Sequence, residues 1–367
     1  MSLPPNLLAI NPGSLSTKFG LYRDDQPLLV RNLQHGKAEL ASRGHDILSQ
    51  LELRLQCIED ELEASGLRLS DLAAVVARGG LLHPVPGGTY RVNDRMLDEL
   101  RRAERGEHAA NLGAFLANAI AQRTDVPAYI VDPVSVDEWI EEARLSGCSQ
   151  LDRPCLSHAL NSKAIARRYA SEVGRSYEDL RLVVAHLGSG HTISAHCHAH
   201  MIDATNSREE GAFSSERAGS VPAMELVRLC FSGKYTRKQI EIMLTREGGL
   251  ISYLGTADLR DVEERIEHGD KHAELVFRAM SYQIAKQIGA MSCVLQGRVD
   301  AILLTGGMSH CQRLTTAVSD AVKWIAPVTI YAGEDELRAL VEGVLRVMRH
   351  EEQSREFGPE IHEAVLT

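Results

Sequence analysis

The 367-residue chain lacks the features that mark several classes of protein. Its seven cysteines are scattered without a C-x-x-C pair, which favours a reducing compartment over a disulfide framework. No basic stretch precedes a long apolar segment near the start, and no apolar run approaches the roughly 18 residues that a membrane span requires. A net charge of -10 and a pI near 5.9 argue against a general nucleic-acid or anionic-membrane surface. These absences predict a soluble, cytoplasmic protein with neither nucleic acid nor a membrane as partner.

The order of apolar and polar segments indicates an α/β protein of two domains. A hydrophobic content of 44% and a charged content of 25% are ordinary for a globular chain, and 367 residues suit two cores better than one. Apolar strands separated by turns open the chain over residues 7–33, and the same arrangement returns over residues 180–203. We interpret this as an internal duplication, with domains over residues 1–150 and 151–367.

Three polar turns that follow apolar strands are candidate phosphate loops. They are NPGSLSTK (11–18), HLGSGHT (186–192) and LTGGMSH (304–310). Backbone amides in such turns can approach an anion and point at it. Taken singly, each turn is more often an ordinary hairpin, and none has the spacing of a Walker loop or of G-x-G-x-x-G.

Together and in this order, the turns are typical of the actin and sugar-kinase superfamily. Within it the chain resembles the acetate kinase family over nearly its whole length, in segments that include ARGGLLHPVPGGTY, HAANLGA, VDPVSVDE, SHALNSKAIARRYA, FSSERAGSVP and GGLISYLGTADLRDV. The resemblance implies two duplicated actin-like (ribonuclease H-like) domains, each with a mixed five-stranded sheet flanked by helices, and a cleft between them. It assigns acyl and phosphate binding to the N-terminal domain and nucleotide binding to the C-terminal one, with the C-terminal helix able to pack back on the first.

The resemblance also implies a carboxylate kinase that uses ATP/ADP and Mg²⁺. Such an enzyme transfers phosphate reversibly and directly from ATP to a short-chain carboxylic acid, giving an acyl phosphate, and associates as a homo-oligomer. The ARGG and ERAGS segments and the length favour butyrate or a short branched acid. Ser157 stands where the acetate enzymes carry Phe, which fits a larger acyl pocket. Acetate or propionate kinase, and a non-catalytic ATP-binding sensor on the same fold, remain alternatives.

Cations and one positioning acid are expected at the reaction centre, because a carboxylate that attacks ATP brings two anions together. By resemblance, Arg78 binds the acyl carboxylate and the transferring phosphoryl group, and Arg217 is the second arginine. The two glycines after Arg78 are expected to let a ligand come close. The resemblance also places His158 at the transition state, Asp132 beside the arginines and His108 near the substrate. From the residues alone, capping or packing suits His158 equally, and a helix N-cap suits Asp132.

By resemblance, the nucleotide and its metal ion use the three candidate phosphate loops together with TADLRDV and YAGEDEL. The residues expected at the nucleotide and its phosphates are Lys18, Ser14, His186, Gly188, Ser189, Gly190, Asp258, Arg260, Gly306 and Gly307. The guanidinium of Arg260 could stack on the base. Mg²⁺ keeps several waters and needs few protein ligands, so Asn11 and one acid suffice. The match puts that acid at Asp335, with Glu334 and Glu336 beside it.

A cluster of histidines offers a competing metal site. In AHCHAHM, alternation along one strand would put His196, His198 and His200 on the same face. No acid or cysteine at useful spacing completes the set. The sequence therefore favours an exposed hairpin face over a zinc site.

Overall fold

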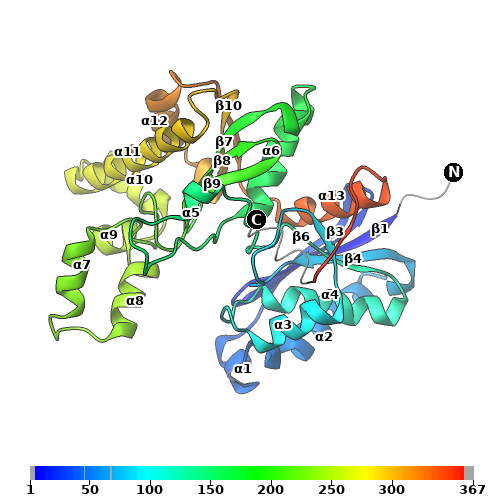
Figure 1. The fold of residues 1–367 in the computed structure, drawn as a ribbon. Helices are drawn as coiled ribbons and strands as arrows, with labels where there is room; N and C mark the ends of the chain where they lie inside the picture. Colours follow the sequence, from blue (N-terminus) through cyan, green and yellow to red (C-terminus); the bar gives the residue numbers. More distant parts are fainter. Residues whose placement is uncertain (1–4, 45, 67, 359–367) are drawn as a thin grey trace. The chain divides into compact units, whose positions relative to one another are not determined.

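The computed structural model describes residues 5–44, 46–66 and 68–358 (Figure 1). The outermost parts of the predicted domains, residues 1–4 and 359–367, lie outside the described residues. Within the described part, no helix is both long enough and apolar enough to cross a membrane.

A seven-stranded sheet forms the first compact unit, in the order β12-β5-β6-β4-β1-β2-β3. Its strands are β1 (Asn6–Pro12), β2 (Ser16–Arg23), β3 (Gln26–Gln34), β4 (Leu72–Arg78), β5 (Thr89–Arg91), β6 (Ala128–Val131) and β12 (Arg355–Glu356). The sheet is mixed, because β1 pairs antiparallel with β2 and parallel with β4. The five expected strands are present. The short strands β5 and β12 extend the sheet beyond β6 and were not expected.

A mixed five-stranded sheet forms the second unit, in the order β11-β10-β7-β8-β9, as predicted. Its strands are β7 (Arg181–Leu187), β8 (His191–Cys197), β9 (His200–Ala204), β10 (Ala301–Gly306) and β11 (Val328–Ala332). The arrangement β3-β2-β1-β4-β6 in the first sheet matches β9-β8-β7-β10-β11 in the second, with an antiparallel hairpin next to parallel strands in each. The two sheets therefore show the internal duplication that the sequence indicated.

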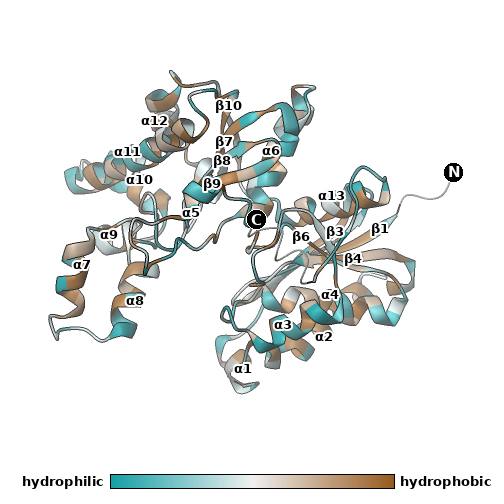
Figure 2. Ribbon diagram, in the orientation of Figure 1, coloured by the Kyte–Doolittle hydropathy of each residue, from teal (hydrophilic) through white to brown (hydrophobic). Residues whose placement is uncertain are grey.

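Helices cover both sheets. Those of the first unit are α1 (Lys37–Ser42), α2 (Leu51–Ala64), α3 (Asp94–Arg102), α4 (Asn111–Thr124) and α13 (Glu336–Met348). Those of the second are α5 (Glu141–Arg144), α6 (Ala159–Glu172), α7 (Ala223–Cys230), α8 (Arg237–Thr245), α9 (Gly249–Leu254), α10 (Leu259–Glu267), α11 (Lys271–Val294) and α12 (Gln312–Val322). The apolar residues lie along the strands and along one side of many helices (Figure 2). This patterning gives each unit its own hydrophobic core.

The two compact units are residues 1–137 with 335–367, and residues 138–334. This division differs from the predicted ranges of 1–150 and 151–367. The difference has two physical causes.

The chain crosses between the units earlier than predicted and then returns to the first unit. The N–H of Ile140 donates to the carbonyl of Ile202 at 3.0 Å, which ties the segment after residue 137 to strand β9. Near the other end, α13 packs on β1, β4 and β6. The approach to β6 is close, because a Cβ on Gly343 would lie 2.6 Å from a methyl group of Val131. Glycine at this position therefore lets α13 lie directly on the first sheet.

Candidate active site

The first predicted phosphate loop connects β1 to β2. Asn11 on β1 and Lys18 on β2 are directly opposed in the antiparallel ladder, so their side chains extend from the same face of the sheet. Lys18 is half-buried, and Ser14 at the tip of the loop is exposed. The structure thus brings the predicted phosphate cation and the predicted metal ligand together.

Glu336, the first residue of α13, joins two predicted site residues of the first unit. Its carboxylate lies 3.0 Å from Nη1 of Arg78 through Oε1, and Oε2 accepts from the side-chain amide of Asn11. The side chains of Arg78 and Glu336 are 21% and 13% exposed. Because this ion pair is largely shielded from water, the acid holds the arginine in one place.

Among the three acids of YAGEDEL, Glu336 is the one that lies beside Asn11. Asp335 instead caps α13, and its carboxylate accepts from the N–H of Arg338 at 3.2 Å. Glu334 belongs to the second unit. An amide oxygen and a carboxylate are ligands that suit Mg²⁺, so Asn11 and Glu336 fit this ion. The geometry favours Glu336 over the predicted Asp335 and Glu334. The preference of Asp for the N-cap position could have distinguished Asp335, as the helix cap, from Glu336.

Asp132 and His108 have local partners in the first unit. Asp132 is 2% exposed, and its Oδ1 accepts from the N–H of Gly88 at 2.7 Å. The N–H of Asp132 donates back to the Gly88 carbonyl at 3.0 Å. Asp132 is no helix N-cap, because the next helix begins at Glu141. His108 is exposed, and its Nδ1 accepts from the N–H of Ala110 at 3.1 Å. Asp132 thus anchors the loop before β5, and His108 stabilises the turn before α4.

The two glycines after Arg78 serve packing. A Cβ on Gly79 would lie 2.5 Å from Cβ of Pro133, and one on Gly80 would lie 2.5 Å from Oδ1 of Asn111. Protein atoms fill the space into which a side chain would extend. Packing therefore requires glycine at both positions, and the approach of a ligand to them stays a prediction.

The second predicted phosphate loop joins β7 to β8 and lies against Arg217. A Cβ on Gly190 would come 2.2 Å from Nη1 of Arg217, so the guanidinium lies directly on this glycine. The same Nη1 donates to the carbonyl and to the hydroxyl of Ser207, at 2.8 and 2.9 Å. Burial lowers the pKa of the Arg217 guanidinium. The structure thus places the predicted second arginine on the predicted second loop.

Two predicted histidines of the second unit form a stack. The rings of His158 and His186 have centroids 4.0 Å apart and planes inclined by 9°. Nδ1 of His158 lies 2.8 Å from Oγ1 of Thr192, and Nδ1 of His186 lies 2.8 Å from Oδ1 of Asn161. Nε2 of His186 is 3.4 Å from the Glu334 carboxylate. His158 occupies the N-cap position of α6 without a capping bond from its side chain. These contacts orient both rings.

His191 is a further member of this group that the sequence did not single out. It is 2% exposed, and its Nε2 lies 3.4 Å from Sδ of Met308. Burial lowers the pKa of His191 to about 3, and His186 and Arg217 act in the same direction. Its Nδ1 is buried without a hydrogen-bond partner among the described residues. The signal that could have found it is its position at the end of the HLGSGHT turn.

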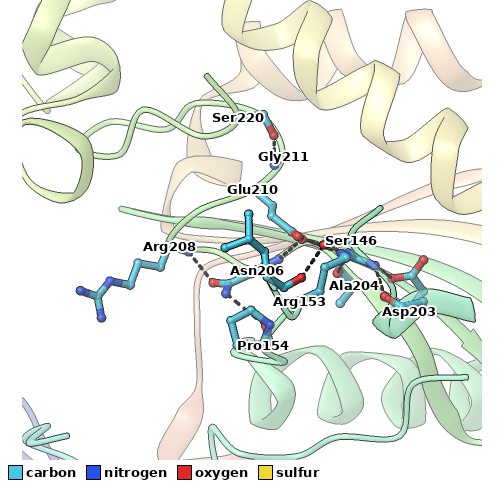
Figure 3. Close-up of polar contacts among 12 residues, drawn as sticks. Ser146, Arg153, Pro154, Asp203, Ala204, Asn206, Arg208, Glu210, Gly211 and Ser220 are labelled. Carbon is cyan, nitrogen blue, oxygen red and sulfur yellow. Dashed lines mark hydrogen bonds and ion pairs between the residues drawn. The ribbon is translucent and has the colours of Figure 1, made fainter. Parts of the chain in front are cut away.

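Arg153 holds the segment that leads to Arg217. Its guanidinium forms a bidentate pair with Glu210, with Nε–Oε1 and Nη2–Oε2 distances of 2.8 and 2.9 Å (Figure 3). The same carboxylate accepts from the N–H of Asn206 at 3.1 Å. The side chain of Arg208 points away from this network (Figure 3). The segment is therefore shaped by a charge-assisted network next to Arg217.

The two predicted adenosine segments line one cavity of about 580 Å³ in the second unit. Asp258 and Arg260 contribute from the start of α10, and Gly307 from the turn after β10. Arg260 is 88% exposed and pairs with Asp258, with an Nε–Oδ1 distance of 2.9 Å. These hydrogen bonds hold the pKa of Asp258 at about 2. The structure therefore brings the two segments together. It also shows the guanidinium of Arg260, which was expected to stack on a base, paired with Asp258.

The end of β10 connects this cavity to the second loop. Gly306 has φ of 92°, and a Cβ there would lie 2.3 Å from the Leu187 carbonyl. Met308 lines the cavity and also lies 3.4 Å from His191. The predicted residues of the second unit therefore form one continuous set.

The three histidines of AHCHAHM do not share a strand face. Strand β8 ends at Cys197, His198 lies in a turn with φ of 50°, and His200 begins β9. His196 is buried, with Nδ1 2.6 Å from the hydroxyl of Tyr177, so the predicted exposed face is also wrong for it. Within residues 5–44, 46–66 and 68–358, no group of three or more His, Cys, Asp or Glu side chains is placed to hold a metal ion.

Known proteins resemble the chain in sequence and in fold. The model of the acetokinase family matches residues 156–343. Butyrate kinase 1 of Clostridium acetobutylicum is 48% identical over 352 residues, which cover 96% of this chain and 99% of that protein. The structure is similar to acetate kinase of Porphyromonas gingivalis (TM-score 0.77, 16% identity, 94% of this chain and 100% of that chain). It is also similar to a propionate kinase of Francisella tularensis subsp. tularensis SCHU S4 (TM-score 0.70, 18% identity, 92% and 98%). At these identities the two structures show the fold alone.

Proposed function

The chain belongs to the acetokinase family and phosphorylates a carboxylate, and we propose that this carboxylate is butyrate or a short branched fatty acid. The observation that carries the choice is the 48% identity to Butyrate kinase 1 over 96% of this chain. Acetate or propionate is the alternative substrate. The solved acetate and propionate kinases support it less, because they share only 16% and 18% identity.

The proposed reaction is a direct, reversible phosphoryl transfer. An oxygen of the ionised carboxylate forms a bond to the γ-phosphorus of ATP. The bond from that phosphorus to the bridging oxygen breaks, and its electron pair leaves with ADP. The carboxylate has no proton to lose, so the protein needs no general base. Its task is to neutralise charge and align the reactants.

Two arginines in the proposal, Arg78 and Arg217, are restrained by their neighbours. In the proposal, Arg78 binds the acyl carboxylate and the transferring phosphoryl group, and Arg217 stabilises the phosphoryl group. The ion pair with Glu336 restrains the first guanidinium, and contact with Gly190 restrains the second. Guanidinium groups held in place before the reaction need little reorganisation during it. The restraint of both guanidinium groups supports a catalytic role for the chain over that of a non-catalytic ATP-binding sensor.

Asn11 and Glu336 would hold Mg²⁺ in this proposal, with waters completing its shell. When bound, the ion would neutralise charge on the nucleotide phosphates. Support comes from the adjacency of an amide and a carboxylate on β1 and α13.

The residue beside His158 supports an acyl group longer than acetate. Ser157 is 6% exposed, and its hydroxyl lies 3.9 Å from Sδ of Met201. In the proposal, a serine leaves more room beside His158 than a phenylalanine would, and the neighbouring methionine is flexible enough to adapt to a longer acyl chain.

An acyl-phosphate trap tests the substrate. The protein is incubated with ATP, Mg²⁺ and hydroxylamine, with acetate, propionate, butyrate, isobutyrate and valerate in turn, and the hydroxamate is quantified. We expect the highest rate with the four-carbon acids and a loss of about 10³-fold in Arg78→Ala. Arg68→Ala, at an exposed arginine paired with Asp71, is the matched control. A maximum at acetate would contradict the butyrate proposal. ATP binding without hydroxamate from any acid would favour the sensor.

We also propose that the chain forms a homo-oligomer. Support comes from α7, which has no buried residue although part of the helix is hydrophobic (Figure 2). Met224, Val227 and, just beyond the helix, Phe231 are 65%, 46% and 87% exposed. Light scattering should give a multiple of the chain mass, and the mass of one chain would contradict the proposal.

A cytoplasmic location is proposed as well. Its support is that all seven cysteines are free, which suits a reducing compartment.

A further inference from the structure

A fully buried arginine lies behind the first phosphate loop. Arg54 on α2 is 0% exposed and reaches the backbone between β1 and β2. Its Nη1 donates to the carbonyls of Gly13 and Ser16, at 2.9 and 2.8 Å. Its Nη2 donates to the carbonyl of Ser14 at 3.1 Å. One side chain from another element thus binds three carbonyls of a loop that is only a few residues long.

Within the described part of the chain, no acid balances the charge of Arg54. The other partners of the guanidinium are neutral: Oε1 of Gln50, at 3.2 and 2.8 Å, and Oγ1 of Thr17, at 3.0 Å. Among the described residues, no carboxylate lies within ion-pair distance of Arg54. Burial lowers the pKa of this guanidinium. Burying a cation without a counter-ion is costly, so a chain that needed only a packed helix would carry an apolar residue here.

The bound carbonyls determine where the amides of the loop point. In a planar trans peptide, the C=O of one residue and the N–H of the next point in opposite directions. The carbonyls of Gly13 and Ser14 point at Arg54, so the N–H groups of Ser14 and Leu15 point away from it. Ser14 is exposed and Leu15 is 47% exposed. Neither N–H has a hydrogen-bond partner in the described part of the chain. Two neighbouring free amides are suited to an anion.

A second contact secures the same loop. The N–H of His35, just after β3, donates to the carbonyl of Leu15 at 2.8 Å. The His35 ring lies 2.8 Å from Oγ1 of Thr17, which Arg54 also contacts. The carbonyls of four consecutive residues, 13–16, are therefore bound by Arg54 or His35.

We propose that Arg54 is a positioning residue that turns the first loop so that the amides of Ser14 and Leu15 face the terminal phosphate of the nucleotide. Arg54 does not itself contact the nucleotide. The inference rests on the proposed function, because it takes the anion to be the phosphate of ATP.

The test compares ATP with adenosine, which lacks the phosphates. Arg54→Lys keeps the positive charge but cannot bind several carbonyls through a planar guanidinium. Affinities of the full-length variant for ATP and for adenosine are measured by calorimetry, and kcat is measured with the hydroxamate trap. We expect an ATP affinity about tenfold lower, as for the loss of a hydrogen bond to a charged group, with adenosine affinity unchanged. The value of kcat should fall about 100-fold, because the phosphate is misplaced.

Two further variants keep the test decisive. Ile58→Ala, one turn further along α2 and fully buried, destabilises the helix without contacting the loop, and should leave the ratio of ATP to adenosine affinity unchanged. Gln50→Leu removes the neutral acceptor that orients Arg54. It should give a smaller, phosphate-selective loss, and it decides the question if Arg54→Lys does not fold.

Two results would overturn the proposal. One is an unchanged ATP affinity in Arg54→Lys, and the other is an equal fall of ATP and adenosine affinities, as a purely structural role would produce. Failure of the proposed function has a different signature: the wild-type chain makes no hydroxamate from any acid. The comparison of ATP with adenosine would still decide the role of Arg54 in that case.

Discussion

The two hairpin loops occupy corresponding places in duplicated sheets, yet the arginine beside each loop contacts it differently. Below the loop between β1 and β2, Arg54 is buried and binds carbonyls, and the tip at Ser14 is exposed. In the loop between β7 and β8, the guanidinium of Arg217 lies against Gly190 itself. The strands pair in the same way in both sheets. The arginine comes from helix α2 in the first unit and from the segment before α7 in the second. The duplicated sheets thus share one backbone arrangement. The arginine beside the first loop binds its carbonyls, and the arginine beside the second loop lies on a glycine.

The largest difference between the two loops is expected when one methyl group is added to each. A Cβ on Gly190 would collide with Nη1 of Arg217 at 2.2 Å, whereas the nearest atom to one on Gly13 would be Oγ of Ser16 at 3.1 Å. We expect Gly190→Ala to lower the rate of hydroxamate formation about 100-fold, because the arginine is displaced. Gly13→Ala should lower it about two- to threefold, as for a substitution without a severe clash. Urea unfolding of both variants separates this effect from instability. Equal losses of activity would refute the contrast between the loops.

Acid should destabilise the chain through the second loop. The pKa of His191 is lowered to about 3 from 6.5 by burial, so as the pH falls the unfolded chain takes up this proton first. The stability that neutral His191 contributes is complete above pH 6.5 and is lost as the pH falls from 6.5 toward 3. At pH 5 the loss is about 2 kcal/mol. His191→Gln should remove this part of the difference in unfolding free energy between pH 8 and pH 5. An unchanged difference would contradict the assignment.

Behind the first loop, burial also lowers the pKa of His35, with Arg54 acting in the same direction. The sign of its pH dependence is therefore the same as for His191. Because His35 is less deeply buried, His35→Gln should change the pH dependence less, and it serves as the matched variant in the first unit.

The smallest expected effect separates the acids around residue 335. Glu336→Gln should raise the Mg²⁺ concentration for half-maximal activity about tenfold, because it removes the carboxylate beside Asn11. Asp335→Ala should leave that concentration unchanged and cost about 1 kcal/mol of stability through the lost N-cap. Activity measured against Mg²⁺ for each variant, with Glu334→Gln as the second-unit control, provides the check. A shift in Glu334→Gln alone would contradict the choice of Glu336.

Much of the fold could be predicted from the sequence, because its longer strands and helices carry clear apolar periodicity. Strands β5 and β12 could not, because they span three and two residues and show no alternation. The prediction that three histidines share one strand face is wrong because the chain reverses at His198. Alternation predicts a face only while the strand continues.

The predictions for the site were limited by tertiary contacts. Arg54 lies in the charged helix sequence LELRLQCIEDELEA, where an arginine suggests a solvent-exposed position. Its burial depends on how α2 meets the loop between β1 and β2, and local sequence does not encode this. The choice between Asp335 and Glu336 depends on where α13 begins, since one residue separates a helix cap from a side chain facing Asn11.

The return of α13 to the first sheet has a consequence for the newly synthesised chain. Residues 138–334 are continuous, so the ribosome releases everything that this unit needs in one stretch. The first sheet, in contrast, is translated early and stays without one of its covering helices until α13 emerges. Glu336 arrives with that helix, so Asn11 and Arg78 lack their shared acid until then. A nascent chain that stops before α13 leaves part of β1, β4 and β6 uncovered, which exposes apolar surface to chaperones and proteases, and it lacks the carboxylate that lies beside Asn11.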